Sequence, residues 1–186
     1  MPNTATSPVS YQLALQQLTC SDALAIRFFY EGDPLPGLDS QLTAQLLPRQ
    51  LREASTKMGT RLLEIGAEIF PSPDLTEYRE LVGSGRAAGH QPLAFAVVAR
   101  SLEVPFPAAL AAYLFATVTS LTQNAVRAIP LGQNAGQRLL RKAAGDVATA
   151  VARAGSLDRS DFGAVSPGLE ISQMRHERQR ARMFMS

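Results

Sequence analysis

Apolar residues recur at steps of three and four along most of the chain, which is the spacing of one face of an α-helix. The clearest example lies between residues 39 and 70. Its predicted buried face consists of Leu42, Leu46, Leu47, Leu51, Ala54, Met58, Leu62 and Ile65. Pro48 falls inside this pattern, and because proline cannot donate a helical hydrogen bond we expect a kink or a restart there.

The N-terminal part of the chain shows shorter helical patterns. Residues 11–30 predict one or two short helices that break near Cys20, with Ser21 or Asp22 as the N-cap of the second. Residues 1–10 lack the pattern and are predicted to be disordered. The stretch EGDPLPGLDS is rich in proline and glycine, so we interpret it as a linker that leads into the long helix.

Three more helices are predicted in the C-terminal half. They span residues 91–102, 107–129 and 131–154. Pro107 suits a first helical turn, and Gly155 suits the position after a last one. The stretch PSPDLTEYRELVGSGRAAGHQP is interpreted as a loop with one short helical turn at most. Its GSGRAAG segment has the glycines of a phosphate loop, but it follows no predicted strand and is interpreted as a flexible loop.

Composition agrees with an all-α fold. The chain has 186 residues, of which 46% are hydrophobic, so it is long enough for one domain with an ordinary core. It contains no Trp and only 6% aromatic residues, so this core consists mostly of aliphatic side chains. Leu and Ala favour helices, and strand-like runs are scarce. We therefore expect a single-domain helical bundle with a flexible C-terminal tail.

One segment raises the question of a membrane span. No charged residue lies between Glu103 and Arg127, and a segment of this length could cross a bilayer. Prolines at one end and hydroxyl and amide residues at the other weaken membrane partitioning, so a buried central helix is favoured. The start MPNTATSPVS does not resemble a signal peptide, and the lone Cys20 excludes an internal disulfide. We expect a cytoplasmic protein that does not contact a membrane.

Charge is unevenly distributed. Residues 1–80 carry 6 basic and 10 acidic side chains, whereas residues 81–186 carry 12 basic and 6 acidic ones. Several of the arginines lie in the tail SQMRHERQRARMFMS, and such runs are usually solvated. The tail also contains large apolar residues, which favour docking onto a partner: Met183, Phe184 and Met185. A DNA-binding regulator that uses this tail is the alternative function, although no aromatic residues separate the arginines as stacking platforms.

The segment AVRAIPLGQNAGQRLL interrupts a helical pattern that resumes at once. Pro130 removes a backbone donor and disfavours the α conformation at the residue before it, so we expect a tight corner between two helices. The free backbone groups of the two helix ends can then bond Gln133, Asn134 or a partner. An ordinary structural corner explains the same residues, and the sequence alone does not decide between the two.

Candidate catalytic and metal-binding residues are few. His90, His176 and Cys20 are the only histidines and cysteine, and they form no recognised catalytic grouping. A small enzyme centred on His90 is a third hypothesis. A tight metal site needs about four ligands, so His176 is at most a transient ligand across a dimer, and we expect no tightly bound cofactor.

Three segments, in the right order, resemble the urease accessory protein UreF family. The first is AVRAIPLGQNAGQRLL, where the family typically has an arginine, an apolar residue, Pro-Leu-Gly-Gln and then Gly-Gln. The second is LPRQLREASTKMGTRLL, which is similar to the family's E-R-x-A-S-x-x-x-G-x-R-L-L helix. The third is the tail, SPGLEISQMRHERQRARMFMS. The usual opening motif of the family is not found, so we expect an N-terminally short or divergent member.

The resemblance implies an all-α scaffold that is not an enzyme. Such a protein bridges the UreD (UreH) accessory protein and the GTPase UreG during nickel insertion into apo-urease, with nickel as the cargo, and forms a homodimer. The resemblance also implies a UreF-like domain over residues 11–167 and a partner-docking tail over 168–186. The implied partner-binding residues are Arg127, Pro130, Gly132, Gln133, Gln137, Arg138, His176, Glu177, Arg182 and Phe184.

Overall fold

The computed structural model describes residues 8–128 and 133–163, and every regular element in these ranges is helical. In chain order the α-helices are α1 (Pro8–Cys20), α2 (Asp22–Tyr30), α3 (Leu35–Gln45), α4 (Arg49–Ile69), α5 (Pro73–Gly83), α6 (Gln91–Ser101), α7 (Phe106–Ala128) and α8 (Gln133–Ser156). A short 3-10 helix, η2 (Arg159–Asp161), follows α8. The all-α prediction is confirmed. The predicted C-terminal tail, 168–186, lies outside the described residues.

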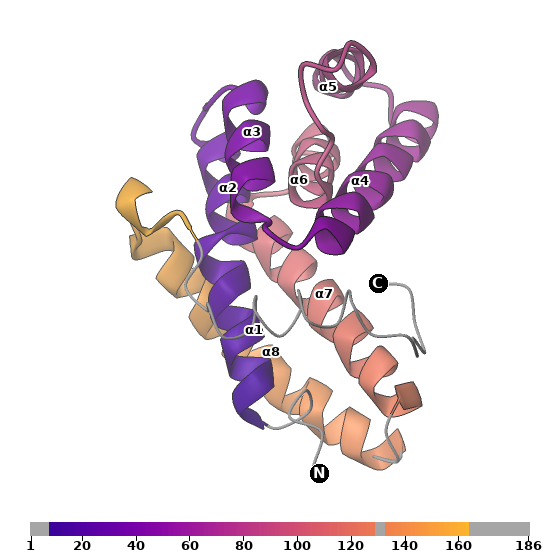
Figure 1. Ribbon diagram of the computed structural model, residues 1–186. Helices are drawn as coiled ribbons and strands as arrows, with labels where there is room; N and C mark the ends of the chain where they lie inside the picture. The colour runs from indigo at the N-terminus through magenta and orange to yellow at the C-terminus, as the bar shows by residue number, and fades with distance from the viewer. Residues whose placement is uncertain (1–7, 129–132, 164–186) are drawn as a thin grey trace.

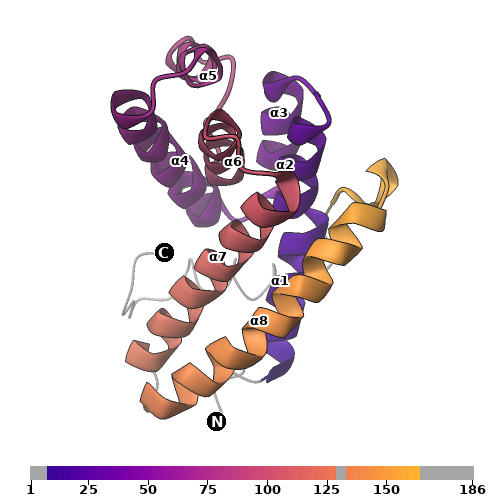
Figure 2. The same ribbon diagram turned by 180° about the vertical axis from the view of Figure 1, so that it is seen from behind.

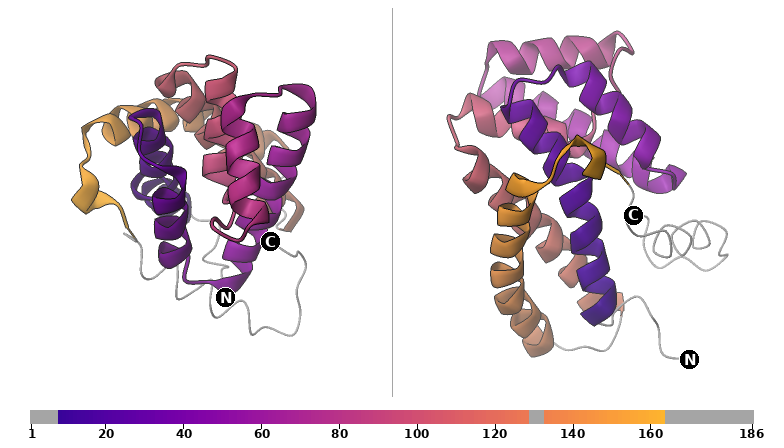
Figure 3. Two further views of the ribbon diagram at one scale, coloured as in Figure 1. Left: turned by 90° about the horizontal axis from the view of Figure 1, so that it is seen from above. Right: turned by 90° about the vertical axis from the view of Figure 1, so that its left-hand side faces the viewer.

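Two groups of helices make up the molecule. The long helices α7 and α8 lie side by side as a hairpin, and α1 lies along them (Figures 1 and 3). The second group contains α3, α4, α5 and α6, with α6 packed between α2 and α4 (Figure 2). Helix α2 contacts both groups, and its residues from Ala23 to Ile26 are fully buried. One continuous apolar core therefore joins the two groups through α2.

The predicted helix over 39–70 is two helices. Helix α3 begins at Leu35, inside the stretch interpreted as a linker, and α4 begins after Pro48. Pro48 has an extended backbone with φ −65° and ψ 120°, so it ends one helical segment and precedes the next. The restart that Pro48 predicts is confirmed. Likewise α1 begins at Pro8, so residues 8–10 are helical where disorder was predicted.

The predicted buried face of this region is wrong for α4. The buried residues of α4 are Gly59, Leu63 and Gly66, whereas Met58 and Ile65 are exposed. Glycines can form a packing face because they let another backbone approach closely. A Cβ on Gly59 would lie 2.0 Å from the carbonyl oxygen of Gly89, so α4 and the residues before α6 are in direct backbone contact.

Helix α5 lies where a loop was predicted. Ser72 caps it, because its side chain accepts a hydrogen bond from the backbone N–H of Leu75, and Pro73 occupies the first turn. Leu75, Tyr78 and Leu81 then form a buried face. The following GSGRAAG segment is partly loop, as predicted, but its last residues are held by hydrogen bonds to Asp39.

The remaining helices agree with the sequence pattern. Helices α1 and α2 meet near Cys20, and α6, α7 and α8 lie within two residues of their predicted bounds. Helix α7 buries one face, which includes Leu110, Leu114 and Val118. No helix in the described part of the chain is long and apolar enough to span a membrane, which agrees with the interpretation of α7 as a buried central helix.

Candidate partner-binding site

The α7–α8 hairpin places part of the predicted site at one end of the molecule. Helix α7 ends at Ala128 and α8 begins at Gln133, so the two helices reverse direction within four residues (Figure 2). Those four, which include Pro130 and Gly132, lie outside the described residues. Arg127 is in the last turn of α7, and Gln133 is in the first turn of α8. The structure therefore brings these two residues to the same end of the hairpin.

Gly136 explains how the two helices approach each other at this end. It is buried, and a Cβ there would lie 2.9 Å from the Cγ2 atom of Val126 and 3.8 Å from the Cγ2 atom of Thr122. Thr122 is also buried, and its hydroxyl donates to the carbonyl oxygen of Val118. Gly136 has no side chain, and the Thr122 hydroxyl is hydrogen-bonded within its own helix. Helices α7 and α8 can therefore pack closely near this end of the hairpin.

The polar residues of the predicted site face outward. Arg127, Gln133, Gln137 and Arg138 are all exposed. Gln133 and Gln137 are separated by four residues on α8, so they share one face of the helix. Neither Arg127 nor Arg138 makes a hydrogen bond or ion pair with any other residue that the structure describes. Within the described ranges these side chains are therefore exposed and have no polar contact of their own.

This end of the hairpin is cationic. No Asp or Glu occurs between residues 104 and 145, whereas that span contains Arg127, Arg138, Arg141 and Lys142. Lys142 forms an ion pair of 2.6 Å with Asp146, but Arg141, like Arg127 and Arg138, has no acidic partner in the described ranges. We define the cationic end as Arg127, Arg138 and Arg141. Arg141 was not among the predicted site residues, although the lack of nearby acidic residues in the sequence was a signal for it.

The other predicted site residues belong to the tail. His176, Glu177, Arg182 and Phe184 lie outside the described residues. The structure does describe the segment that leads to them. The backbone N–H of Gly163 donates to the carbonyl oxygen of Cys20 at 3.1 Å, and the Gln45 side chain donates to the carbonyl oxygen of Phe162 at 3.2 Å. This segment is therefore fixed beside the end of α1 and the end of α3.

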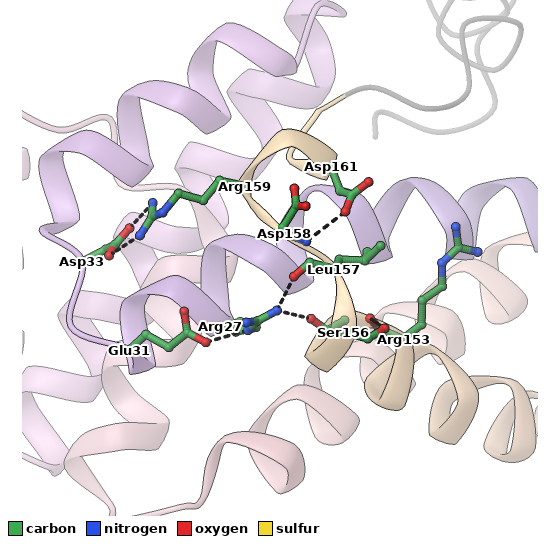
Figure 4. A network of polar contacts seen from close by, with 10 residues as sticks. Arg27, Glu31, Asp33, Arg153, Ser156, Leu157, Asp158, Arg159 and Asp161 are labelled. Carbon is green, nitrogen blue, oxygen red and sulfur yellow. Dashed lines mark hydrogen bonds and ion pairs between the residues drawn. The ribbon is translucent and has the colours of Figure 1, made fainter.

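A cluster of polar contacts fastens the end of α8 to α2, as Figure 4 shows. The guanidinium of Arg27 donates to two carbonyl oxygens at the end of α8, those of Ala154 at 2.9 Å and Leu157 at 2.6 Å. A helix end leaves such carbonyls without intrahelical partners, so Arg27 acts as a C-terminal cap from another helix. Arg159 forms an ion pair with Asp33 and stacks on the ring of Phe28, at 4.6 Å from its centre.

A buried polar network joins α3, α4, α5 and the segment before α6. The Asp39 carboxylate, 1% exposed, accepts hydrogen bonds from the hydroxyl of Tyr78 and from the backbone N–H groups of Ala88, Gly89 and His90. Burial, together with the Asp39 carboxylate, raises the pKa of Tyr78, so this phenol stays protonated and donates. Sequence reasoning missed Asp39, because a buried carboxylate inside a helix breaks no pattern.

His90 belongs to this network and is completely buried. The Thr43 hydroxyl donates to the carbonyl oxygen of Asp39, so it accepts from Nε2 of His90 at 2.9 Å. The Ser55 hydroxyl accepts from the backbone N–H of Gln91 and donates to Nδ1 of His90 at 3.1 Å. This assignment satisfies every donor and makes the imidazole neutral, with its proton on Nε2.

The environment of His90 favours a structural role. Burial lowers the pKa of His90, and Arg52 acts in the same direction, against the Asp39 carboxylate. A general base must come within hydrogen-bond reach of a substrate, and this ring, 0% exposed, does not. The hypothesis of an enzyme centred on His90 therefore loses its basis. In the described part of the chain no three His, Cys, Asp or Glu side chains are grouped so that they could hold a metal ion.

These residues define an all-α protein in which a helical hairpin presents a cationic, polar end. The chain belongs to the UreF family, whose model matches residues 9–144. It is 81% identical over 171 residues to the urease accessory protein UreF of Arthrobacter sp. (strain FB24), covering 92% of this chain and 76% of the relative. The UreF of Paenarthrobacter aurescens (strain TC1) is 70% identical over 171 residues, with coverage of 92% and 77%. The UreF of Bacillus sp. (strain TB-90) is 41% identical over 177 residues, with coverage of 92% and 78%.

The structure also gives physical reasons for the segment LPRQLREASTKMGTRLL. Ser55 bonds both His90 and the N–H of Gln91, Gly59 permits the backbone contact with Gly89, and Leu63 is buried in the core. Three of the residues that match the family helix, Ser55, Gly59 and Leu63, therefore hold α4 against the core and the start of α6. Family membership places the chain among urease accessory proteins.

Proposed function

We propose that this protein is a scaffold that bridges a UreD (UreH)-like accessory protein and a UreG-like GTPase while nickel is inserted into apo-urease. The names of its relatives support a role in urease maturation. The observation that carries the bridging role is the cationic end of the hairpin. Its arginine and glutamine side chains are exposed and make no hydrogen bond or ion pair with other described residues. In this proposal nickel is the cargo, and the protein holds no cofactor tightly.

The chemistry of this end suits an acidic protein surface. A guanidinium binds carboxylates through two parallel hydrogen bonds, which makes arginine a strong and directional contact. Gln133 and Gln137 add donors and acceptors on one face of α8. The close packing of α7 and α8 at Gly136 keeps these groups in place before a partner arrives, so little ordering is required on binding.

Two distant attachment points favour a bridge over a single contact. Helix α8 has 24 residues and is therefore about 36 Å long. The cationic end lies at its start, and the segment that leads to the tail follows its other end. We propose that the hairpin end contacts one partner and that the tail contacts the UreD-like partner, with Phe184 as the apolar anchor and Arg182 as the charged contact. A few such anchors usually dominate binding.

Co-purification with the two partners tests the proposal. The variant Arg127→Glu/Arg138→Glu should lose one partner, and a chain ending at Gly168 should lose the UreD-like one. The control is Arg79→Glu, which reverses one charge at an exposed site on α5. Recovery of both partners by all variants would show that these surfaces are not the contacts. Recovery of neither partner by the unaltered chain would reject the scaffold role itself.

We propose in addition that the protein acts as a homodimer, as the family resemblance implies. A symmetric scaffold would present two copies of each contact, which raises the effective concentration of one partner near another. The size of the protein in solution tests this, independently of whether the partners bind.

A further inference from the structure

The turn between α4 and α5 exposes an apolar surface. Ile69 and Phe70, at the end of α4, are 58% and 42% exposed, and Pro71 and Pro73 beyond them are exposed as well. These four residues lie within five positions of the chain, so they form one continuous patch. An exposed apolar patch with a polar rim is typical of an interaction surface.

A shallow hollow with two carboxylates adjoins this patch. Its lining consists of Pro71, Ser72, Pro73, Thr76, Glu77 and Glu80. Glu77 and Glu80 are three residues apart on α5, so they share one face of the helix. Both are exposed, and neither has a cationic partner among the residues that the structure describes. We call Ile69, Phe70, Pro71, Pro73, Glu77 and Glu80 the acidic corner.

The charge around the acidic corner has one sign. No Lys, Arg or His occurs between Arg61 and Arg79, whereas that stretch contains three glutamates and one aspartate. Arg79 is within two residues of both Glu77 and Glu80, so it faces another side of α5. The cationic end of the hairpin lies at the other end of the molecule and does not neutralise this corner (Figure 1). The corner therefore suits a basic segment that also carries apolar side chains.

The chain itself contains a segment of this chemistry. Residues 175–185 have the sequence RHERQRARMFM, in which four arginines and one glutamate precede Met183, Phe184 and Met185. Arginines at intervals of two to four residues can meet two carboxylates on one helix face, because a guanidinium binds a carboxylate directionally. The apolar end of the segment can then cover the exposed side chains of the corner.

The length of the chain allows this contact. Gly163, the last described residue, is fixed beside the end of α3, and the acidic corner lies at the far end of α4. Helix α4 has 21 residues and is therefore about 31 Å long. Arg178 and Arg182 follow Gly163 by 15 and 19 residues, over which an extended chain spans up to about 50 and 65 Å. The tail is thus long enough to reach the corner of its own molecule.

We propose that the acidic corner is a docking site for residues 175–185 of the same chain. One exposed ion pair contributes little, but a tethered segment has an effective concentration on the order of 1 mM, so weak contacts suffice to hold it. The consequence for binding rests on the proposed function, which assigns Arg182 and Phe184 to the UreD-like partner. The tail cannot occupy both places, so docking lowers its apparent affinity for that partner by the fraction of tail that is free.

Methionine methyl NMR on the full chain tests the docking. The variant Gly83→Cys carries a nitroxide spin label one turn beyond Glu80, where nothing lies within 4 Å of the Cβ position, and Cys20 is buried and stays unlabelled. The methyl signals of Met183 and Met185, assigned by replacing each with Leu, should lose most of their intensity relative to the sample with reduced nitroxide. Screening by high salt should restore them, because the ion pairs are exposed.

Charge reversal then locates the contact. In the spin-labelled chain, Glu77→Lys/Glu80→Lys should restore both methyl signals, and adding Arg178→Glu/Arg182→Glu should broaden them again because the charges are then exchanged. The matched control is Glu53→Lys/Glu103→Lys, which reverses two exposed glutamates away from the corner and should leave the signals broadened. The Met58 signal of the reduced samples shows that α4 remains folded in each variant.

Three results would overturn the inference. The first is a spin label that leaves Met183 and Met185 sharp in the otherwise unaltered chain. The second is an equal response of the corner variant and its control, or a charge exchange that does not restore the broadening. The third is broadening in a mixture in which one chain carries the nitroxide and another the labelled methyls, since the occupant is then the tail of a second copy. No partner is present in these samples, so docking can be observed even if co-purification rejects the scaffold role.

Discussion

Gly59 is the residue of the family motif whose lack of a side chain is required by the packing. Its missing side chain lets the carbonyl oxygen of Gly89 and the backbone N–H of Gln91 approach α4, at 2.0 Å and 2.7 Å from where a Cβ would be. Gly59→Ala should therefore lower the free energy of unfolding by at least about 2 kcal/mol, because backbone atoms must move to make room. Urea denaturation measures this change.

The matched control for Gly59 is Gly145, which is also inside a helix but has nothing within 4 Å of a Cβ position. Gly145→Ala should raise the free energy of unfolding by about 0.5–1 kcal/mol, because alanine is the better helix former. Similar effects of the two substitutions would show that helix propensity, and not the contact between α4 and Gly89, decides the result at Gly59.

His90 makes the stability of the protein depend on pH. Burial lowers its pKa, so between that lowered pKa and the ordinary value of about 6.5 the folded state binds fewer protons than the unfolded state. Stability that depends on the neutral ring is thus complete above pH ~6.5 and is lost as the pH falls through this window. Melting temperatures measured from pH 8 to pH 5 should fall for the unaltered protein, and the decline should be smaller for His90→Gln. An equal decline in both would assign the loss to other groups.

At the scale of elements, the sequence predicts helices better than it predicts their faces. Periodicity and Pro48 predict α4 with its start, but two of the periodic apolar residues of α4, Met58 and Ile65, are exposed. The packed side depends on Gly59 and Gly66, which carry no hydrophobic signal. Helix α5 was missed although Ser72 and Pro73 form a recognisable helix start, because its apolar face has only three buried residues.

The same limit applies to the candidate site. The hairpin corner could be predicted, since a proline and a glycine interrupt an otherwise regular pattern between two arginines. The network around Asp39 and His90 could not, because its members come from four separate segments and only tertiary packing brings them together. The exposure of Arg127 and Arg138 likewise follows from which side of the hairpin packs on the core.

Arg27 supplies the two side-chain hydrogen bonds from α2 to the end of α8. Arg27→Ala removes two hydrogen bonds to the end of α8 and the ion pair with Glu31, so it should lower the free energy of unfolding by about 2 kcal/mol. Arg27→Lys keeps the charge but lacks the planar guanidinium that donates to both carbonyl oxygens. It should lower the free energy of unfolding by about half as much. Arg49→Ala is the control, because its ion pair with Glu53 is long, at 3.6 Å, and exposed. If Arg49→Ala lowers the free energy of unfolding as much as Arg27→Ala does, the effect comes from removing surface charge in general and not from the contact with α8.

At the scale of the whole molecule, charge separates the hairpin end from the rest of the fold. Helices α2 to α5 contain both signs in nearly equal number, whereas residues 104–145 contain basic residues and no acidic ones. A cationic end attracts acidic groups over about one Debye length, ~8 Å at physiological salt. Its main effect is therefore on the rate of association.

Association kinetics with the purified partners can detect this effect. For the partner that contacts the hairpin end, the association rate should fall as salt increases, and Arg138→Ala should lower it about threefold at low salt while making it less sensitive to salt. Lys142→Ala provides the internal comparison, because Lys142 lies on the same helix but is already paired with Asp146 at 2.6 Å. Its substitution should change the rate less, since the Asp146 carboxylate cancels much of its field. Equal effects at the two positions would mean that net charge alone guides the encounter. A rate independent of salt for both partners would mean that neither binds at the cationic end.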